Sequence, residues 1–130
     1  MMNIQAMNTT ALAYIGDAVF EVYVRKTVLG TGQSNTDKLH KMSVRYVKAD
    51  GQAFALKAIM SNLTEQEQSL VKRARNRKIT SKPQNADPVL YKLATAFEAL
   101  VGYLYLSKEE ERLEEVMQMA MRAIENTKNI

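Results

Sequence analysis

The chain has 130 residues, 46% hydrophobic and 25% charged, a size and balance that predict one globular domain over 1–130 and exclude a disordered or fibrous protein. It has no cysteine and one histidine, His40, which excludes disulfide bridges, cysteine nucleophiles and histidine-rich metal sites, so any bound metal must have oxygen ligands. The net charge of +4 leans only modestly toward anionic partners.

The N-terminus has neither the basic start nor the apolar run of a secretory signal, and no stretch reaches the roughly 18 uninterrupted apolar residues of a membrane span. We therefore expect a cytoplasmic protein with no membrane partner. Apolar residues recur at spacings of three and four, and no stretch alternates as a strand would. The pattern predicts an all-α fold of about six to seven helices.

The first predicted helix takes Thr9 or Thr10 as its N-cap, covers 11–29 and stops at Gly30 and Gly32. A short helix then precedes a longer one that a glycine weakens, and Thr64 with Glu67 forms a capping box that opens the next helix. That helix runs into a basic loop whose composition is typical of an exposed connection. The predicted spans here are 36–42, 44–63 with Gly51, 65–77, and the loop 76–86.

Asp87 followed by Pro88 predicts an N-cap with proline in the first helical position. Ser107 with Glu110 predicts a second capping box, which would open the last helix. The helices expected from these two starts cover 89–106 and 111–126.

Glu98 is the only charged residue between positions 93 and 106, in a helix that is otherwise neutral and mostly apolar. A carboxylate there must face a polar cleft, pair with a cation or stay protonated, because an unpaired buried charge costs several kcal/mol, roughly. Glu98 is therefore a candidate functional residue, although a structural role explains the pattern about equally well.

The first helix carries two acids in a similar setting, Asp17 and Glu21. Glu21 has a structural use, because Arg25 lies four residues further along the helix. Asp17 follows Gly16, which helices disfavour and which suggests the close approach of another segment. The charge pattern alone favours an ordinary polar position for Asp17 over a functional one.

Two motifs give these acids a context. AYIGDAVFEVYVR, around Asp17, resembles the signature helix of ribonuclease III domains, and TAFEALVGYLYL, around Glu98, resembles that family's second motif. The segments LHKM over 39–42 and KRARN over 72–76 stand where its Mini-ribonuclease III branch has LHRL-like and RRGRN-like sequences. The resemblance covers essentially the whole chain and implies a homodimeric catalytic domain without an added double-stranded RNA-binding domain.

The resemblance makes Asp17 and Glu98 the catalytic residues and the ligands of Mg²⁺, with Mn²⁺ able to substitute and no small-molecule cofactor. Two further acids of the family are replaced by Ala13 and Thr95, which leaves open whether one or two ions bind. The implied activity is hydrolysis of double-stranded RNA to 5′-phosphate and 3′-hydroxyl ends, in maturation of the 23S ribosomal RNA precursor. A magnesium site suits this reaction because the ion can activate water and stabilise charge on the phosphoryl oxygens.

A basic segment without acids offers a surface for RNA phosphates. The first two of its cations could instead complement the dipole of the helix end. The candidate RNA-binding residues are Lys72, Arg73, Arg75, Arg77, Lys78 and Lys82.

Two other readings compete with this enzyme. The missing acids would fit an inactive ribonuclease III fold that binds RNA or ribosomes, and KRARNRK could serve a DNA-binding regulator, although the helix-turn-helix spacing is lacking. The aromatic residues Tyr14, Phe20 and Tyr23 fit either the core or a surface covered by a second subunit.

Overall fold

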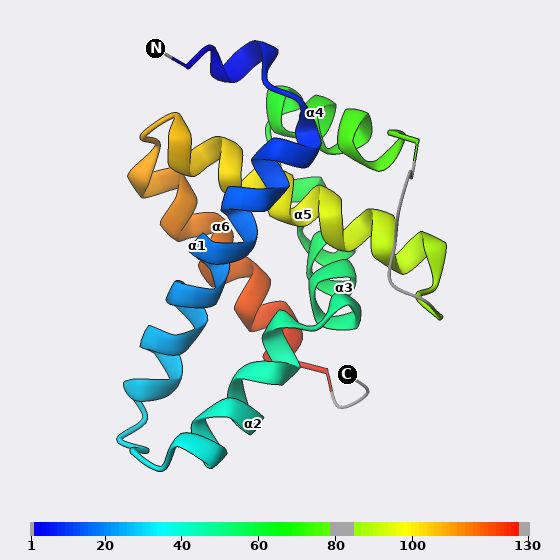
Figure 1. The fold of residues 1–130 in the computed structure, drawn as a ribbon. Helices are drawn as coiled ribbons and strands as arrows, with labels where there is room; N and C mark the ends of the chain where they lie inside the picture. The colour runs from blue at the N-terminus through cyan, green and yellow to red at the C-terminus, as the bar shows by residue number, and fades with distance from the viewer. Residues whose placement is uncertain (1, 79–84, 128–130) are drawn as a thin grey trace.

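The computed structural model describes residues 2–78 and 85–127, and in these ranges it is helical without strands, which confirms the predicted fold class. The described residues form six α-helices and two short 3-10 helices (Figure 1). The α-helices are α1 Thr9–Leu29, α2 Thr36–Val47, α3 Ala49–Ile59, α4 Glu65–Arg75, α5 Pro88–Leu106 and α6 Glu110–Glu125, and the 3-10 helices are η1 Ile4–Ala6 and η2 Met60–Asn62.

Helix α5 is the centre of the fold, and α1, α3, α4 and α6 all pack against it (Figure 1). Its length and apolar composition would by themselves suit a membrane span. The packing gives a different reason for that composition, because Ala96, Phe97, Ala99, Leu100 and Val101 are fully buried in the hydrophobic core.

The start of α1 differs slightly from the prediction. Asn8, and neither Thr9 nor Thr10, is the N-cap, and its side chain accepts a hydrogen bond of 2.9 Å from the backbone N–H of Ala11. Asparagine is as good a cap as threonine, and Thr9 is buried inside the first turn. The predicted end at Gly30 is confirmed.

The boundary between α2 and α3 was predicted in the wrong place. Helix α2 continues to Val47, and the break falls at Lys48, whose backbone is extended. Gly51 then allows α3 to turn back against the end of α2, since a Cβ there would lie 2.5 Å from the carbonyl oxygen of Arg45. Its missing side chain thus permits a close contact between helices.

The two helix starts predicted from capping boxes differ in outcome. The Thr64 and Glu67 capping box is present, and Asp87 caps α5 with Pro88 in its first turn, as predicted. The second box is wrong. Ser107 is the C-cap of α5, and α6 begins at Glu110 with no side-chain cap, because Lys108 takes a positive φ of 60° in the turn between the two helices.

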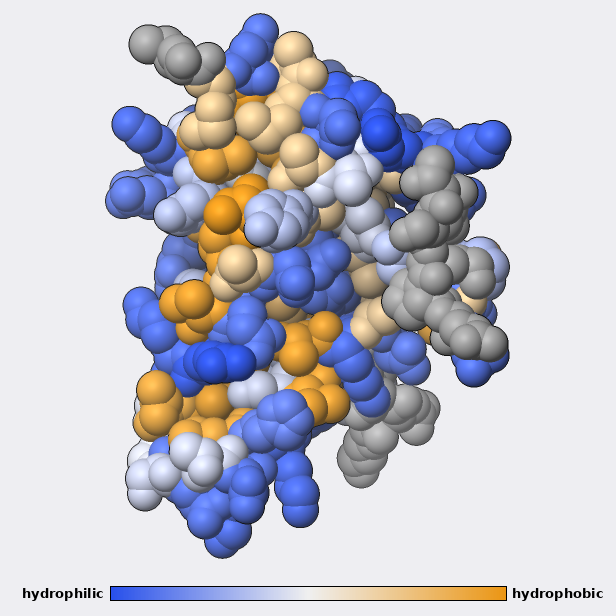
Figure 2. Space-filling model, viewed as in Figure 1, coloured by the Kyte–Doolittle hydropathy of each residue, from blue (hydrophilic) through white to orange (hydrophobic). Residues whose placement is uncertain are grey.

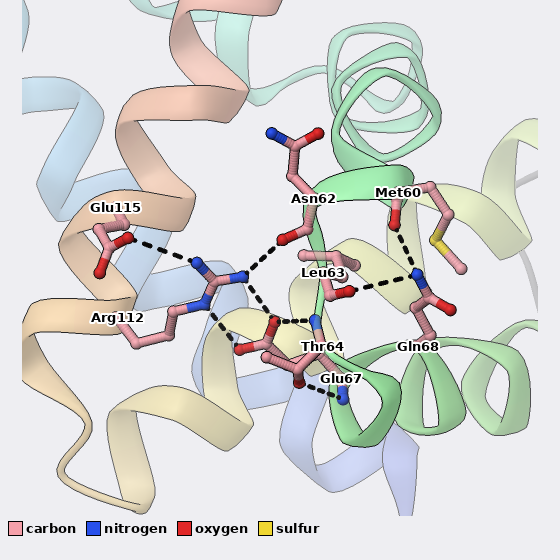
Figure 3. Close-up of polar contacts among 8 residues, drawn as sticks. All are labelled: Met60, Asn62, Leu63, Thr64, Glu67, Gln68, Arg112 and Glu115. Atoms are coloured by element: carbon pink, nitrogen blue, oxygen red, sulfur yellow. Dashed lines mark hydrogen bonds and ion pairs between the residues drawn. The ribbon is translucent and has the colours of Figure 1, made fainter.

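Glu67 also joins α4 to α6 (Figure 3). Both of its oxygens accept hydrogen bonds from Arg112, at 2.9 and 2.8 Å, and the guanidinium also donates to the carbonyl oxygen of Asn62 at 3.0 Å. The Glu67 side chain is only 6% exposed. This network fixes the start of α4, the helix that ends in the basic segment.

Replacing Arg112 with methionine is expected to destabilise the fold by about 2–4 kcal/mol, because the Glu67 carboxylate would stay buried without its cation. The expected loss of stability is smaller than for a fully buried ion pair, because the Arg112 side chain is 22% exposed. Urea unfolding at pH 7 measures the change. Glu115→Gln is the matched control, since Glu115 is 64% exposed and lies 3.5 Å from Arg112. Equal losses for the two variants would contradict the role given to Glu67.

Candidate active site

Helices α1 and α5 cross in direct backbone contact, and two glycines make this possible. A Cβ at Gly16 would lie 1.8 Å from the carbonyl oxygen of Glu98, and a Cβ at Gly102 would lie 1.9 Å from that of Leu12. The contact is reciprocal. Gly16 on α1 faces the turn of α5 that contains Gly102, and Gly102 faces the turn of α1 that contains Gly16. The close approach suggested by Gly16 is therefore real, and the approaching segment is the backbone of Glu98.

An aromatic pair supports the crossing from the core side. Phe20 and Phe97 are both fully buried, and their rings meet edge to face with centroids 5.1 Å apart. Phe20 lies one turn after Asp17 on α1, and Phe97 directly precedes Glu98 on α5. Glycine contacts and ring packing together fix where the two acids meet.

The crossing brings Asp17 and Glu98 together, although they belong to different ends of the sequence. Asp17 is exposed and Glu98 is half-buried. Partial burial raises the pKa of Glu98 to about 8, and a hydrogen bond and charge repulsion from Asp17 contribute in the same direction. Glu98 therefore keeps its proton near neutral pH when no cation is present. Of the outcomes considered for Glu98, the structure favours the protonated one.

A third polar side chain, which the sequence analysis did not single out, lies beside Glu98. Gln52 on α3 is 2% exposed, and its side chain acts on Glu98 in the opposite direction, lowering the pKa. Its Nε2 is buried and has no hydrogen-bond partner within 3.5 Å among the described residues. A glutamine in a helix leaves no pattern that would have identified it from sequence.

The donor set suits a hard divalent cation. No cluster of three or more His, Cys, Asp or Glu side chains exists in the described part of the chain, so two carboxylates are what the crossing offers. Magnesium is commonly held by one or two carboxylates and keeps several of its waters. Ala13, which is buried, and Thr95, which is half-buried, have no carboxylate to add to this set. Asp17 and Glu98 fit a magnesium ion.

The raised pKa of Glu98 has a consequence for stability without metal. In the unfolded chain this carboxyl loses its proton near pH 4.5, whereas in the folded chain it keeps it to about pH 8. The free energy of unfolding should therefore fall as the pH rises from 4.5 to 8. The loss is at most about 1.4 kcal/mol for each pH unit between the two pKa values.

Glu98→Gln should remove this loss, so the variant is expected to gain stability relative to the parent from pH 5 to pH 9. Urea unfolding in EDTA at both pH values measures it. Glu21→Gln serves as the control, because Glu21 forms an exposed pair with Arg25 at 3.0 Å, as predicted. If the stabilities of the parent and of Glu98→Gln changed alike with pH, Glu98 would ionise normally in the folded protein.

The basic segment begins on the last turns of α4 and extends beyond them. Lys72 and Arg73 are exposed, and Arg77 and Lys78 are exposed beyond the helix end. Arg75 is the last helical residue and is half-buried, so the helix dipole accounts for it as well, contrary to the prediction. Lys82 lies outside the described residues. Hydrophilic side chains gather around this end of α4 in Figure 2.

An open groove of about 540 Å³ separates the end of α4 from the N-terminal segment. Arg73, Arg77 and Asn76 line one side, and Asn8 and Thr9 line the other. Thr9 begins α1, and Asp17 follows eight residues later, which places it about 12 Å further along the helix axis. The groove and the acidic crossing therefore lie along the same helix.

Comparison with known proteins agrees with this arrangement. Residues 10–109 match the family model of the ribonuclease III domain. The chain belongs to the ribonuclease III family, and it is an endoribonuclease of that type.

Individual relatives specify the branch. The chain is 50% identical over 114 residues to the Mini-ribonuclease 3 of Symbiobacterium thermophilum, covering 88% of each protein. It is 40% identical over 129 residues to the Mini-ribonuclease 3 of Enterococcus faecalis, covering 98% of each. A crystal structure of a protein from Fusobacterium nucleatum superposes with a TM-score of 0.83 at 32% identity, covering 94% of this chain and 99% of that one. The resemblance to the Mini-ribonuclease III branch is confirmed.

Proposed function

We propose that this endoribonuclease hydrolyses double-stranded RNA with a magnesium ion held by Asp17 and Glu98. One observation carries the proposal: the α1–α5 crossing brings two carboxyl groups from distant parts of the sequence together at a partly exposed position. Charge repulsion from Asp17 helps Glu98 to keep its proton, and a divalent cation relieves that repulsion. Mn²⁺ has the charge and ligand preference to substitute.

The residues of the chain have distinct roles in this mechanism. Asp17, the exposed acid, presents carboxylate oxygens toward solvent, and Glu98 gives up its proton when the cation binds. When bound, magnesium activates water, stabilises charge on the phosphoryl oxygens and assists the departing 3′ oxygen, which gives 5′-phosphate and 3′-hydroxyl products. The basic end of α4 holds the RNA backbone in the groove beside the start of α1.

The dependence of RNA affinity on salt concentration tests whether the exposed cations bind the RNA. Neutralising Arg77 and Lys78 together, as Arg77→Gln with Lys78→Gln, should weaken binding of duplex RNA and reduce the salt slope by about two, one for each lost phosphate contact. Arg75 is left in place because it is half-buried. Fluorescence anisotropy in EDTA, at several salt concentrations, measures affinity without cleavage.

The matched control neutralises Lys108 and Arg122, which are exposed but belong to the α5–α6 turn and to α6. Figure 1 shows that turn on the opposite side of the molecule from the end of α4. An equal loss of affinity in the control would mean that net charge, and not the end of α4, determines binding.

We also propose a homodimer that pairs through α1, so that both strands of a duplex can be cut. Phe20 is a core residue and Tyr23 is half-buried with its hydroxyl donating to Glu114, which leaves Tyr14 as the exposed one of these three aromatic residues of α1. Tyr14 is 85% exposed, Val22 is 59% exposed, and both lie on one face of α1 at a spacing of eight residues. Apolar and hydrophilic side chains alternate over this helix in Figure 2.

The proposed substrate is the 23S ribosomal RNA precursor, in the cytoplasm, and this part depends on the resemblance to the Mini-ribonuclease III branch. The direct test of the activity incubates the purified protein with a duplex RNA and with the same strands unpaired. We expect cleavage of the duplex with Mg²⁺ and none with EDTA. Binding of the duplex without cleavage in any divalent ion would favour the inactive RNA-binding fold.

A further inference from the structure

Gln52 is the buried polar residue whose presence the core does not explain. It lies on α3 among fully buried neighbours, with Ala53 and Ala55 at 0% and Leu56 at 1% exposed. Its side chain reaches Glu98 on α5, the helix against which α3 packs. A leucine would fill a similar volume without burying an amide.

The amide of Gln52 carries a cost in the metal-free protein. Its Nε2 is buried without a hydrogen-bond partner among the described residues, and a buried donor without an acceptor is unfavourable. The preceding residue, Gly51, lies against the carbonyl oxygen of Arg45, so α3 has no room to move closer to α2. The donor is thus held beside Glu98 by the backbone, and its hydrogen bonds are left incomplete.

We propose that Gln52 is a positioning residue, whose side-chain N–H donates a hydrogen bond to the Glu98 carboxylate and orients it to bind the divalent cation. The inference rests on the proposed metal-dependent function. A carboxylate has two oxygens, so one can accept from the amide while the other remains for the ion. An ionised Glu98 would thus supply the acceptor that Nε2 lacks.

The chemistry of an amide suits this position better than a charged donor would. Lysine or arginine in the same place would neutralise Glu98 and compete with the cation, whereas glutamine donates a hydrogen bond and carries no charge. Hydrogen-bond partners of ligating carboxylates commonly contribute 10–100-fold to metal affinity or activity, roughly, even though they do not touch the metal.

The test replaces Gln52 with leucine and measures Mn²⁺ binding by isothermal titration calorimetry on the intact protein without RNA. We expect Gln52→Leu to bind Mn²⁺ roughly tenfold more weakly or worse. Urea unfolding in EDTA should show no loss of stability, because the orphaned amide is gone. Cleavage should recover at higher metal concentration with the KM for duplex RNA unchanged, which a merely structural defect would not produce.

A second variant, Gln52→Met, keeps the length of the side chain and carries the test if leucine does not fold. Gln118→Leu is the matched control, because Gln118 is exposed on α6 and donates to Glu114 at 3.1 Å. Equal Mn²⁺ affinity in the parent, Gln52→Met and Gln118→Leu would overturn the role of Gln52 and leave the proposed function intact. A parent that binds no Mn²⁺, or binds it as well after Glu98→Gln, would instead overturn the proposed function.

Discussion

Asp17→Asn and Glu98→Gln are each expected to lower the cleavage of duplex RNA by roughly a thousandfold or more, since a catalytic ion contributes several kcal/mol and each 1.4 kcal/mol is a factor of ten. Both substitutions keep the shape of the side chain and remove its charge. Single-turnover cleavage in saturating Mg²⁺ measures the effect. Duplex binding in EDTA should be retained, because neither acid belongs to the basic segment.

Glu21→Gln is the control for this experiment. Glu21 lies one turn beyond Asp17 on the same helix and pairs with Arg25, so its loss changes the charge of α1 without changing the crossing. We expect near-parent cleavage from this variant. Normal turnover by Asp17→Asn would refute the catalytic assignment.

Alanine at Gly16 or Gly102 is expected to have the largest effect on the fold, a loss of about 3 kcal/mol or more in the free energy of unfolding. Each new Cβ would meet a carbonyl oxygen at less than 2 Å, and backbone atoms in two central helices cannot yield as a side chain could. Urea unfolding gives the stability. Any folded fraction should be a poor nuclease, because separating α1 from α5 also separates Asp17 from Glu98.

Gly30→Ala tests whether the effect comes from the crossing or from glycine substitution in general. Gly30 caps α1 with an ordinary helical φ of −63°, and a Cβ there would lie 3.2 Å from the nearest atom, the carbonyl oxygen of Thr27. Its stability should stay within about 0.5 kcal/mol of the parent. Parent-like stability of Gly16→Ala would contradict the close crossing.

Local signals in the sequence predicted most of the helices. Periodicity located α1 and α5, and the caps at Thr64 and Asp87 are short-range chemistry that a sequence records directly. Errors occurred where the packing of one helix against the next, or an unusual backbone conformation, decides the helix boundary. The break at Lys48 depends on how α3 packs, and Ser107 could end one helix as well as begin another.

The candidate site was predicted only in part for the same reason. Asp17 and Glu98 were identified by motif resemblance and by their apolar surroundings, and Gly16 hinted at a close approach. That Glu98 supplies the approaching backbone, that Gly102 completes the contact, and that Gln52 lies beside it are properties of three helices packed together. No pattern along one helix contains that information.

The most direct test of the account is to locate the ion. Crystals of the protein grown with Mn²⁺ should give an anomalous difference peak between the carboxylates of Asp17 and Glu98, and crystals of Glu98→Gln should lack it. A peak at another place in a protein that cleaves duplex RNA, or cleavage that survives with no ion bound at the crossing, would contradict the assignment of these two acids as the catalytic metal ligands.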